Sequence, residues 1–209
     1  MPVFFQQQIN ESTRLGIWKI EETEEFFRDN VPLHRDVTHP HKRLQHLAGR
    51  FLLRFLYPDF PYELIQIADT RKPFLPDARF QFSISHCGDF AAAIVSMSTN
   101  VGIDVEIPVE TIGRIRNKFL SSEERDHFGI NGGEQDFALL TKLWSAKEAV
   151  FKWYGHGSVD FRQHIVLKKI DHARMQIACR FEKTGEDLNI EYREFPQIVL
   201  AWVVGSGLH

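Results

Sequence analysis

The C-terminal part of the chain constrains the fold most, because its apolar residues alternate along four successive segments. HIVLKKI, RMQIACRF, NIEYREF and IVLAWVV follow one another within residues 161–204. Such alternation is typical of strands with one buried face, and short connections between the strands favour antiparallel pairing. We therefore predict an antiparallel meander here.

Two other segments have the periodicity of amphipathic helices. In residues 40–56 apolar side chains recur at i, i+3, i+4 and i+7, and Pro40 lies near the start. The second segment, residues 136–154, follows the sequence Asn-Gly-Gly at 131–133 and stops before Gly155 and Gly157. Between them, Ser121 and Glu124 have capping-box spacing, which predicts a further helix start.

The middle of the chain adds more strands. Residues 79–97 alternate and then become apolar around Gly88 and Asp89, which indicates a hairpin or two successive strands, and residues 101–107 predict one more strand. Each half of the chain thus contains a long helix and several strands. We predict an α+β protein with two similar-sized lobes, residues 1–100 and 101–209, although no internal repeat is visible.

Composition excludes some classes of protein. The 209 residues carry a net charge of −3, so no nucleic-acid partner is implied. The N-terminus lacks signal-peptide regions and no apolar run approaches the roughly 20 residues of a membrane span, so we expect a cytoplasmic protein without a membrane anchor. Cys87 and Cys179 do not form a C-x-x-C pair, which favours two buried thiols over a disulfide or zinc site.

A basic stripe lies on the first helix. Arg43, His46, Arg50 and Arg54 are spaced by three and four residues and so share one face. The stripe is either a solvated surface or an anion contact. A transition-metal site at His39, His41 and His46 is disfavoured because these histidines do not share one helical face.

The strand at residues 101–107 carries an acidic pair. Asp104 and Glu106 point to the same face, opposite the apolar side chains of Ile103 and Val105. The carboxylates either face solvent or bind a cation. Mg²⁺ takes oxygen ligands at about 2.1 Å and borrows phosphate oxygens from its substrate, so a Mg²⁺ site would also imply a phosphorylated ligand.

Charged residues also interrupt the apolar arc of the helix at residues 136–154. Lys147 lies inside the arc, and Glu148 and Lys152 lie at its edge, one turn apart. One interpretation is that Lys147 extends its ammonium to water and that Glu148 and Lys152 form a surface ion pair. The other is that Glu148 completes a metal site and that a lysine contacts a phosphate.

VGIDVE at 101–106 and WSAKEAVFK at 144–152 together resemble the paired signatures of the 4'-phosphopantetheinyl transferases, of the long surfactin-synthetase-activating type. FLSSEE at 119–124 and SISH at 83–86 are similar to two further elements of that family. The resemblance implies transfer of phosphopantetheine from coenzyme A to a serine of an apo acyl or peptidyl carrier protein, as in holo-[acyl-carrier-protein] synthases. It also implies a pseudo-dimer of two α/β lobes with the active site in the cleft between them.

The resemblance implies roles for individual residues. The Mg²⁺ ligands would be Asp104, Glu106 and Glu148, and Glu148 or a water held by the metal would take the serine proton. Lys152 would stabilise or protonate the leaving phosphate. The residues that would contact coenzyme A come from both halves of the chain: Arg43, Arg50, Lys72, Ser85, His86, Lys147 and Lys152.

The chain departs from the family pattern at two positions. The glycine of the family's Gly-Lys-Pro sequence is Arg71 here, and an asparagine two residues before Ser85 is Ser83. Neither departure affects the predicted metal ligands.

The sequence also allows predictions about the partner protein and about two alternative functions. We expect a monomer that docks an acidic carrier-protein helix, either on Arg114, Arg116, Lys118 and Phe119 or elsewhere if these form a solvated loop. One rival is a metal-dependent nuclease or phosphohydrolase, and a nuclease of the D…(D/E)-x-K type is disfavoured because Pro108 stands where its lysine is needed. A non-catalytic carrier-binding module is disfavoured because the acidic and lysine constellation is intact.

Overall fold

A computed structural model describes residues 3–31, 37–77, 79–130 and 136–205. Within these ranges, two large antiparallel sheets, one two-stranded sheet and two long helices form the main elements of a mixed α/β architecture. The Asn-Gly-Gly sequence that we expected to break the chain lies outside the described residues. No helix in the described ranges is long and apolar enough to cross a membrane.

The first sheet is built from the N-terminal half. Its strands lie in the order β1 (Val3–Asn10), β2 (Thr13–Lys19), β6 (Phe90–Ser96) and β5 (Gln81–Cys87). The predicted helix is confirmed as α2 (Pro40–Leu56), which packs on this sheet, and the short α1 (Glu24–Arg28) packs on α2. The predicted hairpin is confirmed as β5 and β6, with Gly88 and Asp89 in the turn.

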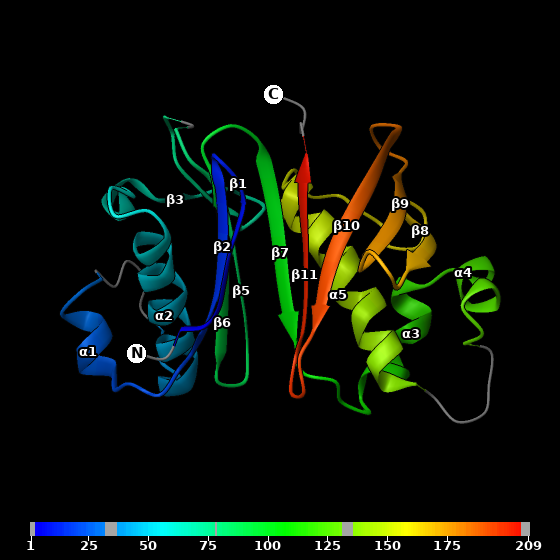
Figure 1. Ribbon diagram of the computed structural model, residues 1–209, viewed down its shortest axis with the longest axis horizontal. Helices are drawn as coiled ribbons and strands as arrows, with labels where there is room; N and C mark the ends of the chain where they lie inside the picture. The colour runs from blue at the N-terminus through cyan, green and yellow to red at the C-terminus, as the bar shows by residue number, and fades with distance from the viewer. Residues whose placement is uncertain (1–2, 32–36, 78, 131–135, 206–209) are drawn as a thin grey trace.

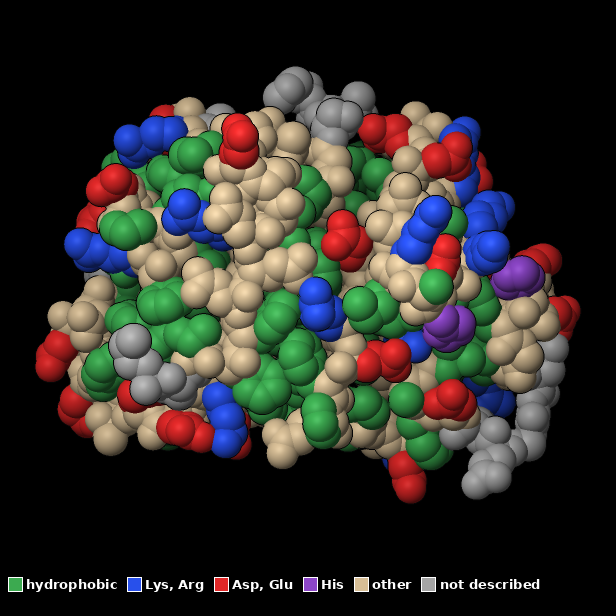
Figure 2. Space-filling view, viewed as in Figure 1, with side chains coloured by type: hydrophobic (Ala, Val, Ile, Leu, Met, Phe, Trp, Pro, Cys, Tyr) green, Lys and Arg blue, Asp and Glu red, His purple; other side chains and the backbone are tan. Residues whose placement is uncertain are grey.

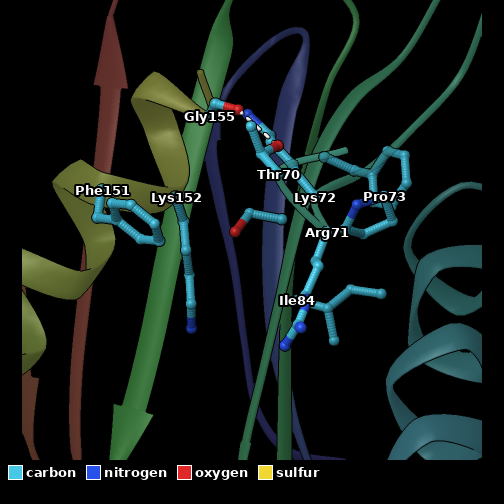
Figure 3. A pocket seen from close by; sticks show the side chains of 10 residues that line it. Thr70, Arg71, Lys72, Pro73, Ile84, Phe151, Lys152 and Gly155 are labelled. Atoms are coloured by element: carbon cyan, nitrogen blue, oxygen red, sulfur yellow. Dashed lines mark hydrogen bonds between the residues drawn. The ribbon is translucent and has the colours of Figure 1, made fainter. Parts of the chain in front are cut away.

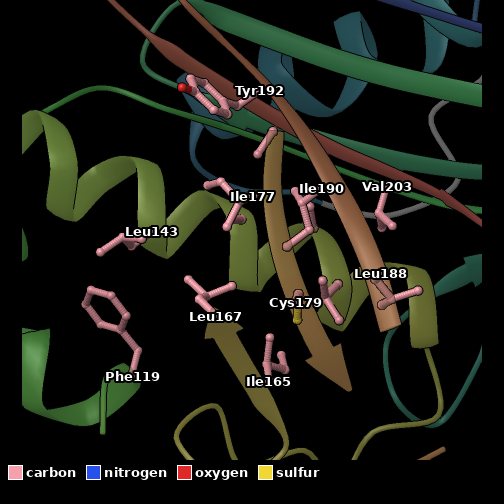
Figure 4. Close-up of a cluster of buried hydrophobic side chains, with 14 of the residues drawn as sticks. Phe119, Leu143, Ile165, Leu167, Ile177, Cys179, Leu188, Ile190, Tyr192 and Val203 are labelled. Carbon is pink, nitrogen blue, oxygen red and sulfur yellow. The ribbon is translucent and has the colours of Figure 1, made fainter. Parts of the chain in front are cut away.

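The second sheet confirms the predicted meander. Its order is β7 (Asn100–Glu106), β11 (Val199–Gly205), β10 (Glu186–Glu194), β9 (Gln176–Phe181) and β8 (Ile165–Asp171). The helix α5 (Phe137–Tyr154) packs on β7, β11 and β10, and a core of aliphatic and aromatic side chains fills the space beneath it (Figure 4). Gly155 ends α5 in the left-handed conformation, with φ of 71°.

Two short helices follow β7. They are α3 (Ile112–Phe119) and α4 (Ser122–His127). The predicted capping box of α4 is present: the Glu124 backbone N–H donates to Ser121 Oγ at 3.2 Å, and the Ser121 N–H donates to the Glu124 carboxylate at 2.9 Å. This box fixes the start of α4 and also turns the Glu124 carboxylate inward, where it is 3% exposed.

The two sheets pack against each other through a third apolar core. This core joins side chains of β2 and β6 to side chains of β7 and β11, including Leu15, Ile94, Ile103 and Trp202. The order of layers is therefore helix, sheet, sheet, helix, with α2 on one flank and α5 on the other (Figure 1). At the junction of the sheets β5 lies beside β7, and the Ile103 N–H donates to Ser83 Oγ at 3.2 Å.

A small hairpin bridges the two halves. After the 3-10 turn η1 (Tyr62–Leu64), β3 (Gln66–Ile67) pairs with β4 (Pro73–Phe74). In the turn between them Thr70 Oγ1 donates to the carbonyl of Gly155 at 3.0 Å. The hairpin of the N-terminal half thus contacts the C-terminal end of α5.

Candidate functional site

One glycine decides which way the acidic strand faces. A Cβ placed on Gly102 of β7 would lie 2.0 Å from the carbonyl oxygen of Ala149 in α5, so only glycine lets the helix lie directly on this strand. Val101, Ile103 and Val105 point into the core between the sheets. Since side chains alternate along a strand, Asp104 shares the face of Gly102 and points toward α5.

Asp104 meets a lysine and a serine there. Its Oδ1 accepts hydrogen bonds from Lys152 Nζ at 2.7 Å and from Ser85 Oγ at 2.8 Å, and Lys152 Nζ also donates to Ser85 Oγ at 2.9 Å. Ser145 Oγ donates to the Asp104 carbonyl oxygen at 3.2 Å and ties the helix to the strand. Strand β5, strand β7 and helix α5 thus each contribute one group to a triangle of charged and polar atoms.

Two more carboxylates crowd the same region. Burial and the negative charge of Asp104 raise the pKa of Glu148 to about 7, and the same two causes raise the pKa of Glu106. Trp144 Nε1 donates to Glu106 Oε1 at 3.3 Å, and the indole ring packs edge-on against Phe119. Asp104 therefore lies close enough to both glutamates to disfavour their ionised forms.

The carboxylate oxygens of this group are ligands of the kind that a hard divalent cation takes, but their present spacing does not form a complete site. Asp104 Oδ2 is buried and has no hydrogen-bond partner in the described structure, so one carboxylate oxygen is free to ligate. In the described ranges no three acidic, histidine or cysteine side chains are gathered closely enough to hold an ion as they stand. The Lys152 ammonium supplies the compensating positive charge at Asp104 in this arrangement.

Lys147 lies away from this group. Its side chain is fully buried, and its ammonium donates to the Glu124 carboxylate and to the Phe161 carbonyl, both at 2.8 Å. Glu124 also accepts the Leu167 N–H at 2.8 Å. The lysine thus joins α5 to α4 and to the region that leads into β8, and neither proposed interpretation, an extended surface lysine or a phosphate contact, describes this buried ion pair.

A pocket of about 280 Å³ opens beside the charged triangle. Lys72, Lys152 and Phe151 lie along it together with Arg71 (Figure 3). Lys72 Nζ donates to the carbonyl oxygen of Trp153 at 3.4 Å, and burial lowers the pKa of Lys72 to about 8. The pocket draws residues from the β3–β4 hairpin, from β5 and from α5, so both halves of the chain form its wall.

A second pocket, also about 280 Å³, adjoins the first. Arg71, Pro73 and Ile84 line both pockets, and the second also contains Arg50, His46 and His86. Burial lowers the pKa of Arg50 and of His86. Arg43 lies elsewhere: its guanidinium forms two hydrogen bonds with Glu24, at 2.7 and 2.8 Å, and a third with the Val37 carbonyl.

The structure therefore brings together most of the residues singled out from the sequence. Asp104, Glu106, Glu148 and Lys152 share one region with Ser85, while Lys72, Arg50 and His86 line the two pockets. Lys147 and Arg43 are bound to acidic partners outside it.

Sequence reasoning missed two participants. Trp144 precedes Glu148 by one helical turn, and that spacing could have marked it as a neighbour of the acidic group. Arg71 attracted notice only as a departure from a pattern, yet it lines both pockets.

Comparisons with known proteins give matches to one family. Residues 100–203 match the family model of the 4'-phosphopantetheinyl transferase superfamily. Enterobactin synthase component D of Escherichia coli K12 is 33% identical over 114 residues, which is 53% of this chain and 54% of that protein. The 4'-phosphopantetheinyl transferase AcpT of Escherichia coli O157:H7 is 28% identical over 142 residues, covering 65% of this chain and 72% of that protein.

A further relative is AcpT of Salmonella typhimurium LT2, which is 30% identical over 116 residues, or 54% of this chain and 60% of that protein. The match with enterobactin synthase component D spans about half the length of that relative. The family match includes β7, α5 and the meander, and so contains Asp104, Glu106, Glu148 and Lys152. Residues 100–203 of this chain are therefore similar to the 4'-phosphopantetheinyl transferase superfamily.

Proposed function

We propose that the protein transfers 4'-phosphopantetheine from coenzyme A to a serine of an apo carrier protein. Within the family we place it with the long surfactin-synthetase-activating type, and its reaction is that of a holo-[acyl-carrier-protein] synthase. The observation that carries the proposal is the group of three carboxylates and Lys152 beside two cation-lined pockets. Coenzyme A is a polyanion with two separate phosphate positions, and two adjoining pockets of this charge suit it.

The two halves act as lobes of a pseudo-dimer, residues 1–100 and 101–209, with the substrate between them. Support comes from the first pocket, whose wall contains Thr70 and Lys72 from one half and Phe151 and Gly155 from the other. It also comes from the similar construction of the halves, each a sheet covered by one long helix.

Asp104, Glu106 and Glu148 would hold Mg²⁺ together with the diphosphate of coenzyme A. The ion would supply positive charge at the phosphoryl group as it is attacked. Lys152 would pair with the diphosphate instead of with Asp104, and Lys72, whose ammonium contacts the C-terminal end of α5, would add a second cation to the pocket. Ser85 and His86 would contact the nucleotide end.

The carrier serine attacks the phosphorus atom that bears the pantetheine arm. The serine O–P bond forms and the bond to the other phosphate of the diphosphate breaks, so adenosine 3',5'-bisphosphate leaves. Glu148 accepts the serine proton, because a hydroxyl is a weak nucleophile without a base. Lys152 stabilises the negative charge that develops on the leaving phosphate.

The carrier protein would dock on α3. Arg114 and Lys118 are exposed on this helix, close in sequence to the acidic strand, and they would meet an acidic helix. Phe119 is 1% exposed and packs against Trp144, so it belongs to the core and offers no docking contact. On the face shown in Figure 2 acidic and basic side chains are interspersed, so any docking charge is local.

Intact-mass analysis of several apo carrier proteins, incubated with coenzyme A and Mg²⁺, tests the proposal. We expect a gain of the phosphopantetheine mass on at least one carrier and no gain when the metal is chelated. Glu148→Gln should lower the rate on the order of a hundredfold or more, because it removes both a ligand and the proposed base.

Glu182→Gln is the matched control, since Glu182 is exposed in the turn between β9 and β10 and lies outside the site. It should transfer at the rate of the unmodified protein. A protein that binds carriers but adds no mass to any of them would contradict the proposal and support a binding module.

A further inference from the structure

Arg71 has a backbone conformation that glycine favours. The Arg71 N–H donates to the Ala68 carbonyl at 2.8 Å, which closes a turn over Ala68, Asp69 and Thr70, and Arg71 itself follows in the left-handed region with φ of 68°. A turn followed by one left-handed residue is a common way to close a short hairpin, and that residue is usually glycine. The family pattern has glycine here, so the chain keeps the turn but introduces a side chain at a conformational cost.

The side chain reaches the space shared by the two pockets. From the hairpin Arg71 extends toward Ile84, on the other side of the first pocket from Lys152 (Figure 3). Ile84 and Arg71 also line the second pocket. None of the ion pairs formed within the described ranges includes Arg71.

The second pocket already contains a guanidinium that forms no ion pair with any described residue. Arg50 is half-buried, and burial lowers its pKa, yet it takes part in no ion pair among the described residues. The described residues that line this pocket include no acidic side chain. Two arginines and two histidines, His46 and His86, therefore surround a space that suits an anion and that no carboxylate of the described chain fills.

We propose that Arg71 binds the 3'-phosphate of coenzyme A and makes the enzyme discriminate against 3'-dephospho-coenzyme A. The inference rests on the proposed function, and it adds a contact that the family's glycine could not make. The diphosphate has its own cations in Lys72 and Lys152, which line only the first pocket, whereas Arg71 is shared with the pocket of Arg50. An arginine also forms paired hydrogen bonds with a phosphate, which a lysine cannot do.

If the Arg71 side chain were only solvated, nothing would explain why a non-glycine residue occupies this left-handed backbone position. Glycine or asparagine fits the left-handed position with less strain, so a side chain without a role at this position only costs stability. Replacement of Arg71 should therefore change stability and ligand affinity in opposite directions. A structural role would lower both together.

The experiment compares coenzyme A with 3'-dephospho-coenzyme A, each titrated into the full chain by calorimetry. Arg71→Gly should weaken binding of coenzyme A about tenfold to a hundredfold, the range expected for a charge-assisted hydrogen bond, and should change binding of 3'-dephospho-coenzyme A less than threefold. The midpoint of thermal unfolding without ligand should stay equal or rise. Arg71→Asn should give the same loss, because asparagine tolerates the turn but is uncharged.

Arg79→Ala is the charge-matched control, since it removes an exposed arginine from the same half of the chain, where it pairs with Asp77. It should leave both affinities unchanged. An equal loss for the two ligands would overturn the proposal by placing Arg71 at the diphosphate, and no loss for either would overturn it outright. The mass-gain assay on the unmodified protein tests the transferase function separately, because it does not depend on Arg71 discriminating between the two ligands.

Discussion

Replacing Lys147 by methionine should destabilise the fold strongly, because it breaks a buried ion pair. The ammonium and the Glu124 carboxylate are 0% and 3% exposed and lie 2.7 Å apart. Methionine has a similar length, so little volume is lost, but a carboxylate stays buried, and the donors left to it among the described residues are the Ser121 and Leu167 N–H groups. Removal of one partner of such a pair costs about 3–5 kcal/mol.

Urea denaturation followed by circular dichroism measures this free energy of unfolding. Glu124→Gln should also be destabilising, and the double variant Lys147→Met with Glu124→Gln should lose less than the sum of the single variants, because neither charge is then left alone. Arg28→Met is the control, since Arg28 pairs with Glu24 at 2.6 Å but is 52% exposed, and its loss should stay within about 1 kcal/mol. A loss of similar size for Lys147→Met would refute the reasoning.

Three further outcomes follow from contacts at the site. Asp104→Asn should lower the rate of phosphopantetheine transfer on the order of a hundredfold or more in a mass-based assay. The substitution removes the charge that pairs with Lys152 and a carboxylate oxygen available to a metal. Near-normal transfer would contradict the proposed role of Asp104 in catalysis. Burial lowers the pKa of Lys72 to about 8 in the folded chain, against an ordinary value of 10.5, so the folded state binds fewer protons than the unfolded state between pH 8 and 10.5. The free energy of unfolding should therefore rise with pH in this range, by on the order of 1 kcal/mol more than in Lys72→Met. Parallel pH profiles of the two proteins would show that burial does not lower this pKa. Gly102→Ala should lower the free energy of unfolding, measured by urea denaturation, by about 3 kcal/mol or more, because its Cβ would lie 2.0 Å from a carbonyl oxygen of α5. In the control Gly205→Ala the nearest atom would be 3.6 Å from the new Cβ, so the loss should be about 1 kcal/mol or less.

The elements that could be predicted from the sequence are those that short-range patterns determine. The start of α2 at Pro40, the capping box of Ser121 with Glu124 and the end of α5 at Gly155 each depend on residues within a few positions. The meander could be predicted because alternation marks each strand separately. The hairpin of β1 and β2 was not predicted, because the glutamines of VFFQQQIN hide the alternation of an edge strand.

The partners of charged side chains could not be predicted, because they depend on contacts distant in sequence. Arg43 lies on the basic stripe of α2, but it is paired with Glu24, which is 19 positions away. Lys147 was placed correctly on the apolar arc, yet its partner Glu124 is 23 positions away on another helix. Periodicity predicts the face of the helix on which a side chain lies, but the group that the side chain contacts depends on how the elements pack together.

The apolar core between the two sheets sets the smallest part of the chain that can fold. Residues 100–203 match the family, but in the intact protein the outward face of β7 and β11 is covered by Leu15, Ile94 and their neighbours from the other sheet. A polypeptide limited to the matched segment would present this face to water, and we expect it to aggregate or stay partly unfolded. The segment that resembles the family is then smaller than the unit that folds cooperatively, and the matched segment needs a second sheet to cover its apolar face.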